Sequence, residues 1–108
     1  MIILYRAISE GEKENFDNGR QFRTAKNTLE AKQFFKSRTA VRQFVASSVT
    51  QDYDPPYVYL LVVGLDEASF AQTEHTQMKL DGYEAVNVEE DDLAVFNNCV
   101  KFVREELL

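Results

Sequence analysis

The sequence is poor in cysteine, histidine and glycine, and each scarcity removes a class of protein. Cys99 is the single cysteine of the 108 residues, and His75 is the single histidine. One cysteine cannot form an internal disulfide, so a disulfide-stapled secreted scaffold is excluded and a reducing compartment is expected. A structural zinc site needs about four ligands, mostly Cys and His, so one chain cannot supply it. We therefore predict no metal site and interpret Cys99 as a buried structural thiol rather than as a nucleophile paired with His75.

Glycine-rich phosphate loops and long apolar runs are also missing. With four glycines and no G-x-G-x-x-G or Walker pattern, a Rossmann or P-loop nucleotide site is excluded. The longest apolar run, Tyr57 to Leu65, is far shorter than a membrane span. The apolar stretch at residues 1–8 is too short for a signal peptide, and no basic region precedes it. We expect a cytoplasmic protein that has no targeting segment and does not bind membranes.

What the chain does have is enough apolar material for one core. Apolar residues make up 44% of the sequence, and eight Phe and five Tyr are among them. This content argues against disorder, and the length suits one domain over residues 1–108. The net charge of −6 is unevenly spread, since residues 1–54 carry +2 and residues 55–108 carry −8. The overall acidity argues against nucleic acid as the main partner.

The basic residues of the first half gather in one stretch. Between residues 20 and 42, Glu30 is the one acidic residue. The basic residues of this stretch are Arg20, Arg23, Lys26, Lys32, Lys36, Arg38 and Arg42. Such a local excess can mark a site for an anionic ligand. The acidic block at residues 89–92 is interpreted as charge at a helix N-terminus rather than as a metal site.

Hydrophobic periodicity predicts alternating strands and helices. Strands are expected at residues 1–8, 32–36, 57–64 and 83–88, and the third has the near-continuous apolar character of a central strand. Helices are expected at residues 10–18, 38–49 and about 91–106, and Ser9 and Ser37 are the N-caps of the first two. Residues 66–79 fit part helix and part strand. The short elements and hairpin-like spacing favour an α+β fold, with a mixed or antiparallel sheet and about three helices.

Three polar positions could carry chemistry, and each has a structural alternative. Arg6 interrupts an apolar strand, where it could hold a phosphate bidentately, reach solvent from an edge strand or form an internal salt bridge. Ser37 lies between a strand and a helix, where it could contact a phosphate-bearing ligand or serve only as a helix cap. Glu84 lies in a strand, where it could orient a ribose hydroxyl or stabilise an oxocarbenium-like centre, or simply face solvent.

The order of these three residues resembles that of the arginine–serine–glutamate ADP-ribosyltransferases. The segments LYRAIS and KQFFKS, each followed by a helix, and the stretch LDGYEAVNVEEDDLAVFNN are similar to small bacterial domains of the ADP-ribosyltransferase-like superfamily. The resemblance implies that fold and NAD as the substrate. It implies that Arg6 contacts the NAD phosphates or the adjacent ribose, and that Ser37 shapes the nicotinamide pocket with Phe35 nearby. It also implies that Glu84 is the catalytic residue.

Two function classes follow from the sequence. The first is an ADP-ribosyltransferase-like domain that binds NAD, or another phosphate-bearing small molecule, and transfers or hydrolyses ADP-ribose. The second is a non-catalytic acidic module, such as an adaptor, an antitoxin or an immunity protein, whose acidic second half covers a basic protein partner.

Overall fold

The computed structural model describes residues 1–22, 31–50, 57–80 and 82–108, with side chains described throughout except at 48–50. The chain order is β1 (Ile2–Ile8), α1 (Glu10–Asp17), β2 (Lys32–Phe35), α2 (Arg38–Thr50), β3 (Tyr59–Leu65), α3 (Glu67–Ala71), β4 (Thr76–Leu80), β5 (Tyr83–Val88), the 3₁₀ turn η1 (Glu90–Asp92), α4 (Leu93–Cys99) and β6 (Val100–Leu107). Arg23, Lys26 and Glu30 of the predicted basic stretch lie outside the described residues.

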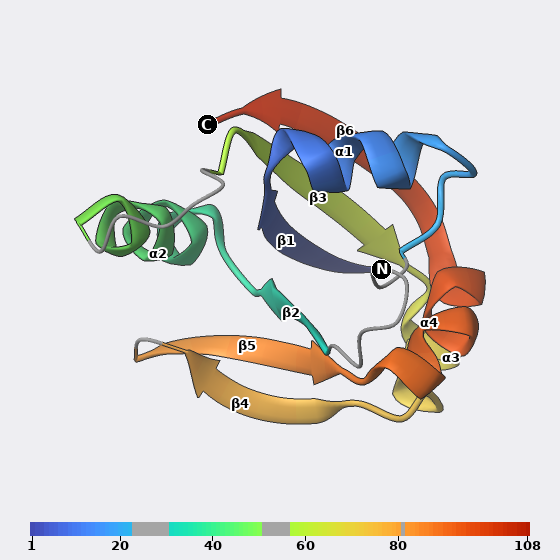
Figure 1. The fold of residues 1–108 in the computed structure, drawn as a ribbon. Helices are drawn as coiled ribbons and strands as arrows, with labels where there is room; N and C mark the ends of the chain where they lie inside the picture. Colours follow the sequence, from blue (N-terminus) through green and yellow to red (C-terminus); the bar gives the residue numbers. More distant parts are fainter. Residues whose placement is uncertain (23–30, 51–56, 81) are drawn as a thin grey trace.

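The six strands form one antiparallel sheet in the order β4-β5-β2-β1-β3-β6. In Figure 1, α2 lies at one end of the sheet, α3 and α4 lie at the other, and α1 lies near β3 and β6. The α+β prediction and the single compact domain are confirmed. The central position predicted for β3 is confirmed only as an interior position. β3 lies between β1 and the edge strand β6, and six of its seven residues are buried.

Each face of the sheet carries its own core. On one face, α1, α3 and α4 enclose a cluster rich in phenylalanine: Phe16, Phe22, Phe34, Phe70 and Phe96, with Leu4, Ile8 and the β3 and β5 side chains between them. On the other face, α2 covers a smaller cluster that includes Ala7, Phe35, Ala40, Val41, Leu60 and Ala85. The larger aromatic cluster has edge-to-face and stacked ring pairs, such as Phe34 with Phe96 at 4.8 Å between centroids. We refer below to these as the α1 face and the α2 face.

Local capping explains where the first helices begin. The Ser9 hydroxyl accepts from the Glu12 backbone N–H at 3.3 Å, and the Ser37 hydroxyl accepts from the Ala40 N–H at 3.1 Å. Both predicted N-caps are therefore confirmed. Residues 66–80 contain the short helix α3 and the strand β4, as the mixed pattern of this segment predicted.

The predicted C-terminal helix over residues 91–106 is wrong in its second half. The helix ends at Cys99, and the chain continues as strand β6, which pairs with β3. The apolar residues that suggest a helical stripe beyond Cys99 instead pair across the sheet, as Val103 does with Val63. Continuing the helix would leave the buried strand β3 without hydrogen-bond partners along one edge, which is costly for a strand interior. Gly64 fits this pairing because the Phe102 ring occupies the space where a side chain would lie.

The described residues contain no helix long and apolar enough to cross a membrane.

Candidate functional site

The candidate site is a gap inside the sheet, where β1 and β2 part. Although both strands are fully described, their ladder consists of the single pair Tyr5–Phe35. Antiparallel continuation would place Ala7 opposite Gln33. A cavity of about 240 Å³ opens there instead, lined by Arg6, Ala7, Gln33, Phe35, Phe44, Tyr57 and Leu80.

The main chain of Ala7 faces this gap. The Ile8 carbonyl accepts from the Val58 N–H at 2.9 Å, which shows that Ile8 directs its carbonyl toward the β3 side. Backbone direction alternates along a strand, so the odd-numbered residues of β3 face β1, and their even-numbered partners in β1 face β3. The odd-numbered Ala7 therefore directs its N–H and C=O toward β2, on the side where β2 has moved away. Since Ala7 lines the cavity, its N–H donor and C=O acceptor are directed to the side on which the cavity opens.

Aromatic rings form the walls of the cavity on the α2 face. The ring centroids of Phe35 and Phe44 are 5.2 Å apart, and those of Phe44 and Tyr57 are 5.6 Å apart. Phe35 is buried, whereas Phe44 and Tyr57 are half-buried. Rings at such positions suit stacking or edge contacts with a planar ligand.

Arg6 borders the cavity but is held from the α1 face. Its Nε and NH2 donate to the two carboxylate oxygens of Glu12 at 2.7 and 2.8 Å, and its NH1 donates to the Gln33 carbonyl at 2.9 Å. The internal salt bridge considered from the sequence is therefore present. The bond to Gln33 links β1 to β2 through a side chain where the backbone ladder is absent.

The Glu12 carboxylate forms ion pairs with two cations. Besides Arg6, the ammonium of Lys32 lies 3.6 Å from a Glu12 oxygen, and the Lys32 side chain is only 6% exposed. Burial by itself would raise the pKa of Glu12, but the hydrogen bonds and charges of Arg6 and Lys32 outweigh burial and hold that pKa below its ordinary value. Glu12 is therefore ionised at neutral pH and fixes the position of the Arg6 guanidinium.

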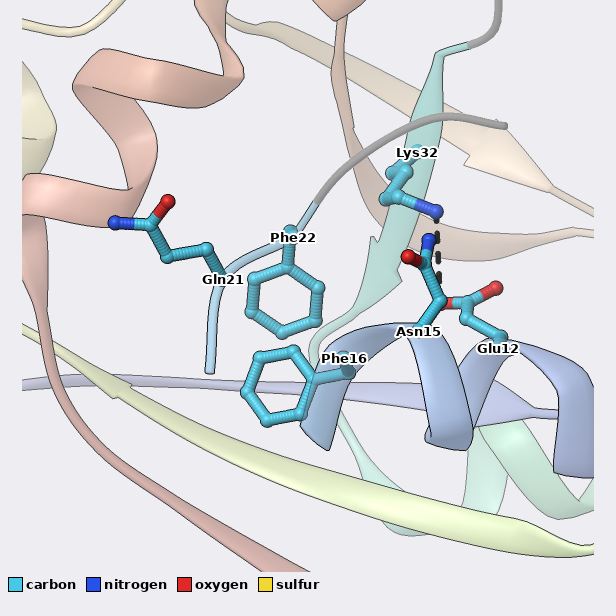
Figure 2. Close-up of a pocket in the computed structure, with 6 residues that line it drawn as sticks. All are labelled: Glu12, Asn15, Phe16, Gln21, Phe22 and Lys32. Carbon is cyan, nitrogen blue, oxygen red and sulfur yellow. Dashed lines mark ion pairs between the residues drawn. The ribbon is translucent and has the colours of Figure 1, made fainter. Parts of the chain in front are cut away.

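A shallow depression lies beside this charge cluster. Figure 2 shows its lining residues Glu12, Asn15, Phe16, Gln21, Phe22 and Lys32, with the ammonium of Lys32 directed at α1. The depression has almost no room for a water molecule, because the Phe16 and Phe22 rings pack together at 4.8 Å. It is part of the packed core, and the cavity at Ala7 is the better candidate for a ligand.

The other two residues of the predicted constellation do not line the cavity. Ser37 is exposed, and its hydroxyl caps α2. Glu84 is exposed on β5, next to Ala85, which pairs with Phe35 and belongs to the α2 face. Since neighbouring side chains of a strand point to opposite faces, Glu84 points to the α1 face, away from the cavity. The structure thus brings Arg6 and Phe35 to one place and leaves Ser37 and Glu84 outside it.

The thiol of Cys99 and the imidazole of His75 are both packed against other residues. Cys99 is buried, and burial raises the pKa of its thiol, with the charge of Asp66 acting in the same direction. The His75 ring stacks on Phe70 at 4.2 Å, and its Nδ1 lies 3.0 Å from the Thr73 hydroxyl. Among the described residues, no group of three or more His, Cys, Asp and Glu side chains is placed to hold a metal ion.

The sequence did not indicate five of the residues that line the cavity: Ala7, Gln33, Phe44, Tyr57 and Leu80. Phe44 falls on the apolar face of a predicted helix and Tyr57 begins a predicted strand. Both aromatic residues were therefore explained by core packing, and neither indicated a cavity. Ala7 acts through its backbone, which leaves no signal in the residue type.

Comparison with known proteins adds no family. No protein-family model matches the chain, and neither the curated proteins nor the solved structures searched give a match.

Proposed function

We propose that this protein binds NAD and holds its nicotinamide group in the cavity at Ala7. The observation that carries the proposal is the pairing of a main-chain donor and acceptor with aromatic walls in one cavity. A primary carboxamide presents one of its two N–H donors beside its C=O acceptor, and this edge complements the Ala7 C=O and N–H. The attached ring would lie against Phe35, Phe44 or Tyr57.

The size of the cavity supports one ring rather than a whole dinucleotide. Benzene fills an engineered cavity of about 150 Å³ in another protein, so about 240 Å³ accommodates a ring with a carboxamide substituent. The ribose and diphosphate of NAD would extend outside the cavity. The basic stretch offers two cations for them: Lys36 lies just before α2 and Arg42 lies within α2, the helix that carries the cavity residue Phe44.

The proposal covers binding, and the transfer or hydrolysis of ADP-ribose is a separate prediction. The resemblance implies catalysis by Glu84, whose side chain points to the face opposite the cavity. Incubation with NAD, with released nicotinamide measured by chromatography, tests this role. Loss of release in Glu84→Gln would support it, whereas equal release by Glu84→Gln and the wild type would remove Glu84 from the reaction.

A ligand series tests the binding proposal. Calorimetric titration with NAD, nicotinamide and benzamide should give binding, because all three carry a ring with a carboxamide. Nicotinic acid should bind at least tenfold more weakly, because its carboxylate lacks the N–H donor that the Ala7 carbonyl needs. A ligand present at about one hundred times its dissociation constant should stabilise the fold by about 2.7 kcal/mol.

Two half-buried phenylalanines of the chain form a matched pair of variants. Phe44→Ala removes a cavity wall and should weaken nicotinamide binding, whereas Phe102→Ala removes a ring on β6 outside the cavity and should not. No heat and no thermal shift with NAD or nicotinamide at millimolar concentration would refute the proposal. The alternative predicted from the sequence, an acidic protein-binding module, would then be the better hypothesis.

A further inference from the structure

Strand β6 forms an open edge of the sheet. It is the last strand in the sheet order and pairs only with β3 among the described strands. Figure 1 shows β6 along the outside of the molecule, with the C-terminus at its end. It spans eight residues, which is long for an edge strand, and such an edge is a template for another strand.

The direction of the β6 backbone is known from two contacts. The Leu108 N–H donates to the carbonyl of Val58, the residue before β3, in register with the β3–β6 pairs. The even-numbered residues of β6 therefore face β3, and Val103, Glu105 and Leu107 face outward. Independently, the Arg20 side chain donates to the Val103 carbonyl at 3.3 Å, which requires that carbonyl to be accessible from outside the β3–β6 ladder. Three residues thus direct their N–H and C=O groups outward in the regular part of the strand.

We propose that two copies of this chain associate through antiparallel pairing of β6 with β6, with Glu105 opposite Glu105 of the second copy. In this register Arg104 lies opposite Glu106 of the second copy, and Val103 lies opposite Leu107 of the second copy. Each pair occurs twice because of the two-fold symmetry. The association adds Arg104 of the second copy to each Glu106, whose carboxylate already accepts from Arg38 of its own chain at 2.8 and 3.3 Å. It also covers Leu107, which is 76% exposed in the single chain.

Other registers of the β6–β6 pairing also bring outward-facing N–H and C=O groups of the two copies together, but their side-chain pairs are less favourable. A shift by one ladder step toward the start of β6 places Arg104 opposite Arg104, and a shift toward its end places Glu106 opposite Glu106. A longer shift that centres the pairing on Val103 leaves Leu107 uncovered. That longer shift also relies on the backbone between Val100 and Phe102, where the β3–β6 register is irregular.

Three features oppose the association and make it weak. Glu106 is already paired with Arg38, and Glu105 lies 3.5 Å from Lys13 of its own chain, so the second copy has to share carboxylates that have a partner. The Glu105 carboxylates of the two copies face each other, and like charges at directly opposite positions are unfavourable. The Arg20 guanidinium, which also lies 3.9 Å from Glu105, has to leave the Val103 carbonyl to a backbone N–H of the second copy. We therefore expect a concentration-dependent dimer whose affinity increases when the charge of Glu105 is removed.

Sedimentation velocity between about 10 μM and 1 mM tests the proposal on variants that circular dichroism shows to be folded. Glu105→Gln should associate about fivefold more tightly than the wild type, which corresponds to about 1 kcal/mol. Arg104→Glu and Glu106→Arg should each abolish association, and the double variant with both changes should restore it. A mixture of the two single variants should also form dimers, because each chain then supplies the charge that the other needs.

A control at the opposite sheet edge completes the test. Lys79→Glu changes an exposed charge on edge strand β4 and should leave the association unchanged. The proposal is overturned if wild type and Glu105→Gln both remain monomeric to 1 mM. It is also overturned if charge reversal at Arg104 has no effect, or if Lys79→Glu is the change that dissociates the dimer.

Discussion

Removing the charge of Glu12 should destabilise the protein far more than an equivalent change elsewhere on the same helix. The carboxylate accepts two hydrogen bonds from Arg6 and forms an ion pair with Lys32, and the exposed fractions of the Arg6, Glu12 and Lys32 side chains are 16%, 21% and 6%. Glu12→Gln removes a carboxylate that interacts with two largely buried cations. Loss of one partner from a buried pair costs about 3–5 kcal/mol, and the partial exposure here lowers this to about 3 kcal/mol.

The assay is urea unfolding followed by circular dichroism, with thermal unfolding as a second measure. At about 4 °C per kcal/mol for a domain of this size, Glu12→Gln should lower Tm by about 12 °C. Glu14→Gln is the matched control, because Glu14 lies on the same helix and is exposed, and its effect should stay within about 0.5 kcal/mol. Equal losses in the two variants would refute the assignment of Glu12 as the anion that binds Arg6 and Lys32.

The pH dependence of unfolding gives a second, independent check of Glu12. Its pKa is lower in the folded state than the ordinary value of 4.5, so the folded protein favours the charged form. The resulting stabilisation is complete above pH 4.5 and is lost as the pH falls below 4.5 through the lowered folded-state pKa. The wild type should lose more stability than Glu12→Gln over this acid range, whereas the contributions of Asp17 and Asp66, whose pKa values are also lowered, remain in both proteins. Identical slopes for the two proteins would contradict the prediction.

Three further predictions concern single contacts. Gly64→Ala should destabilise the protein by about 1–3 kcal/mol in urea unfolding, because its methyl group would overlap the Phe102 ring, and Gly64→Ala combined with Phe102→Ala should recover part of the loss. Ser37→Ala should cost about 1 kcal/mol through loss of the α2 cap, while binding of nicotinamide stays unchanged; a large loss of affinity would instead support the ligand-binding role that the resemblance implies. Cys99 should react with a thiol reagent much more slowly in the folded protein than in 6 M urea, and equal rates would contradict its burial.

The fold was largely predictable where the sequence pattern has a local cause. Ser9 and Ser37 mark helix starts through their own hydroxyls, and the run at Tyr59–Leu65 is apolar because both of its faces are covered. Strand β6 was not predictable in this way. Its apolar positions continue the stripe of α4, and its conformation depends on the open edge of β3, which is distant in the sequence.

The site was predictable only in part, for a similar reason. Arg6 and Phe35 are conspicuous residue types, and both border the cavity. The cavity itself arises because β1 and β2 pair at one position and then separate, and this separation is a property of the backbone. No residue type signals that the main chain of Ala7 faces an opening. Glu84 matched the family order in the sequence, but strand alternation, counted from the Phe35–Ala85 pair, directs it to the other face.

The contact from Arg6 to the Gln33 carbonyl has a consequence for the cost of binding. The Arg6 side chain spans the opening between the two strands, and its two hydrogen bonds to Glu12 fix its position. The opening therefore exists before any ligand arrives, and a ligand would not spend binding energy to separate the strands. Binding should accordingly be fast and should change the backbone little. A substitution of Glu12 that releases the Arg6 side chain should slow the binding of nicotinamide as well as lower the stability of the fold.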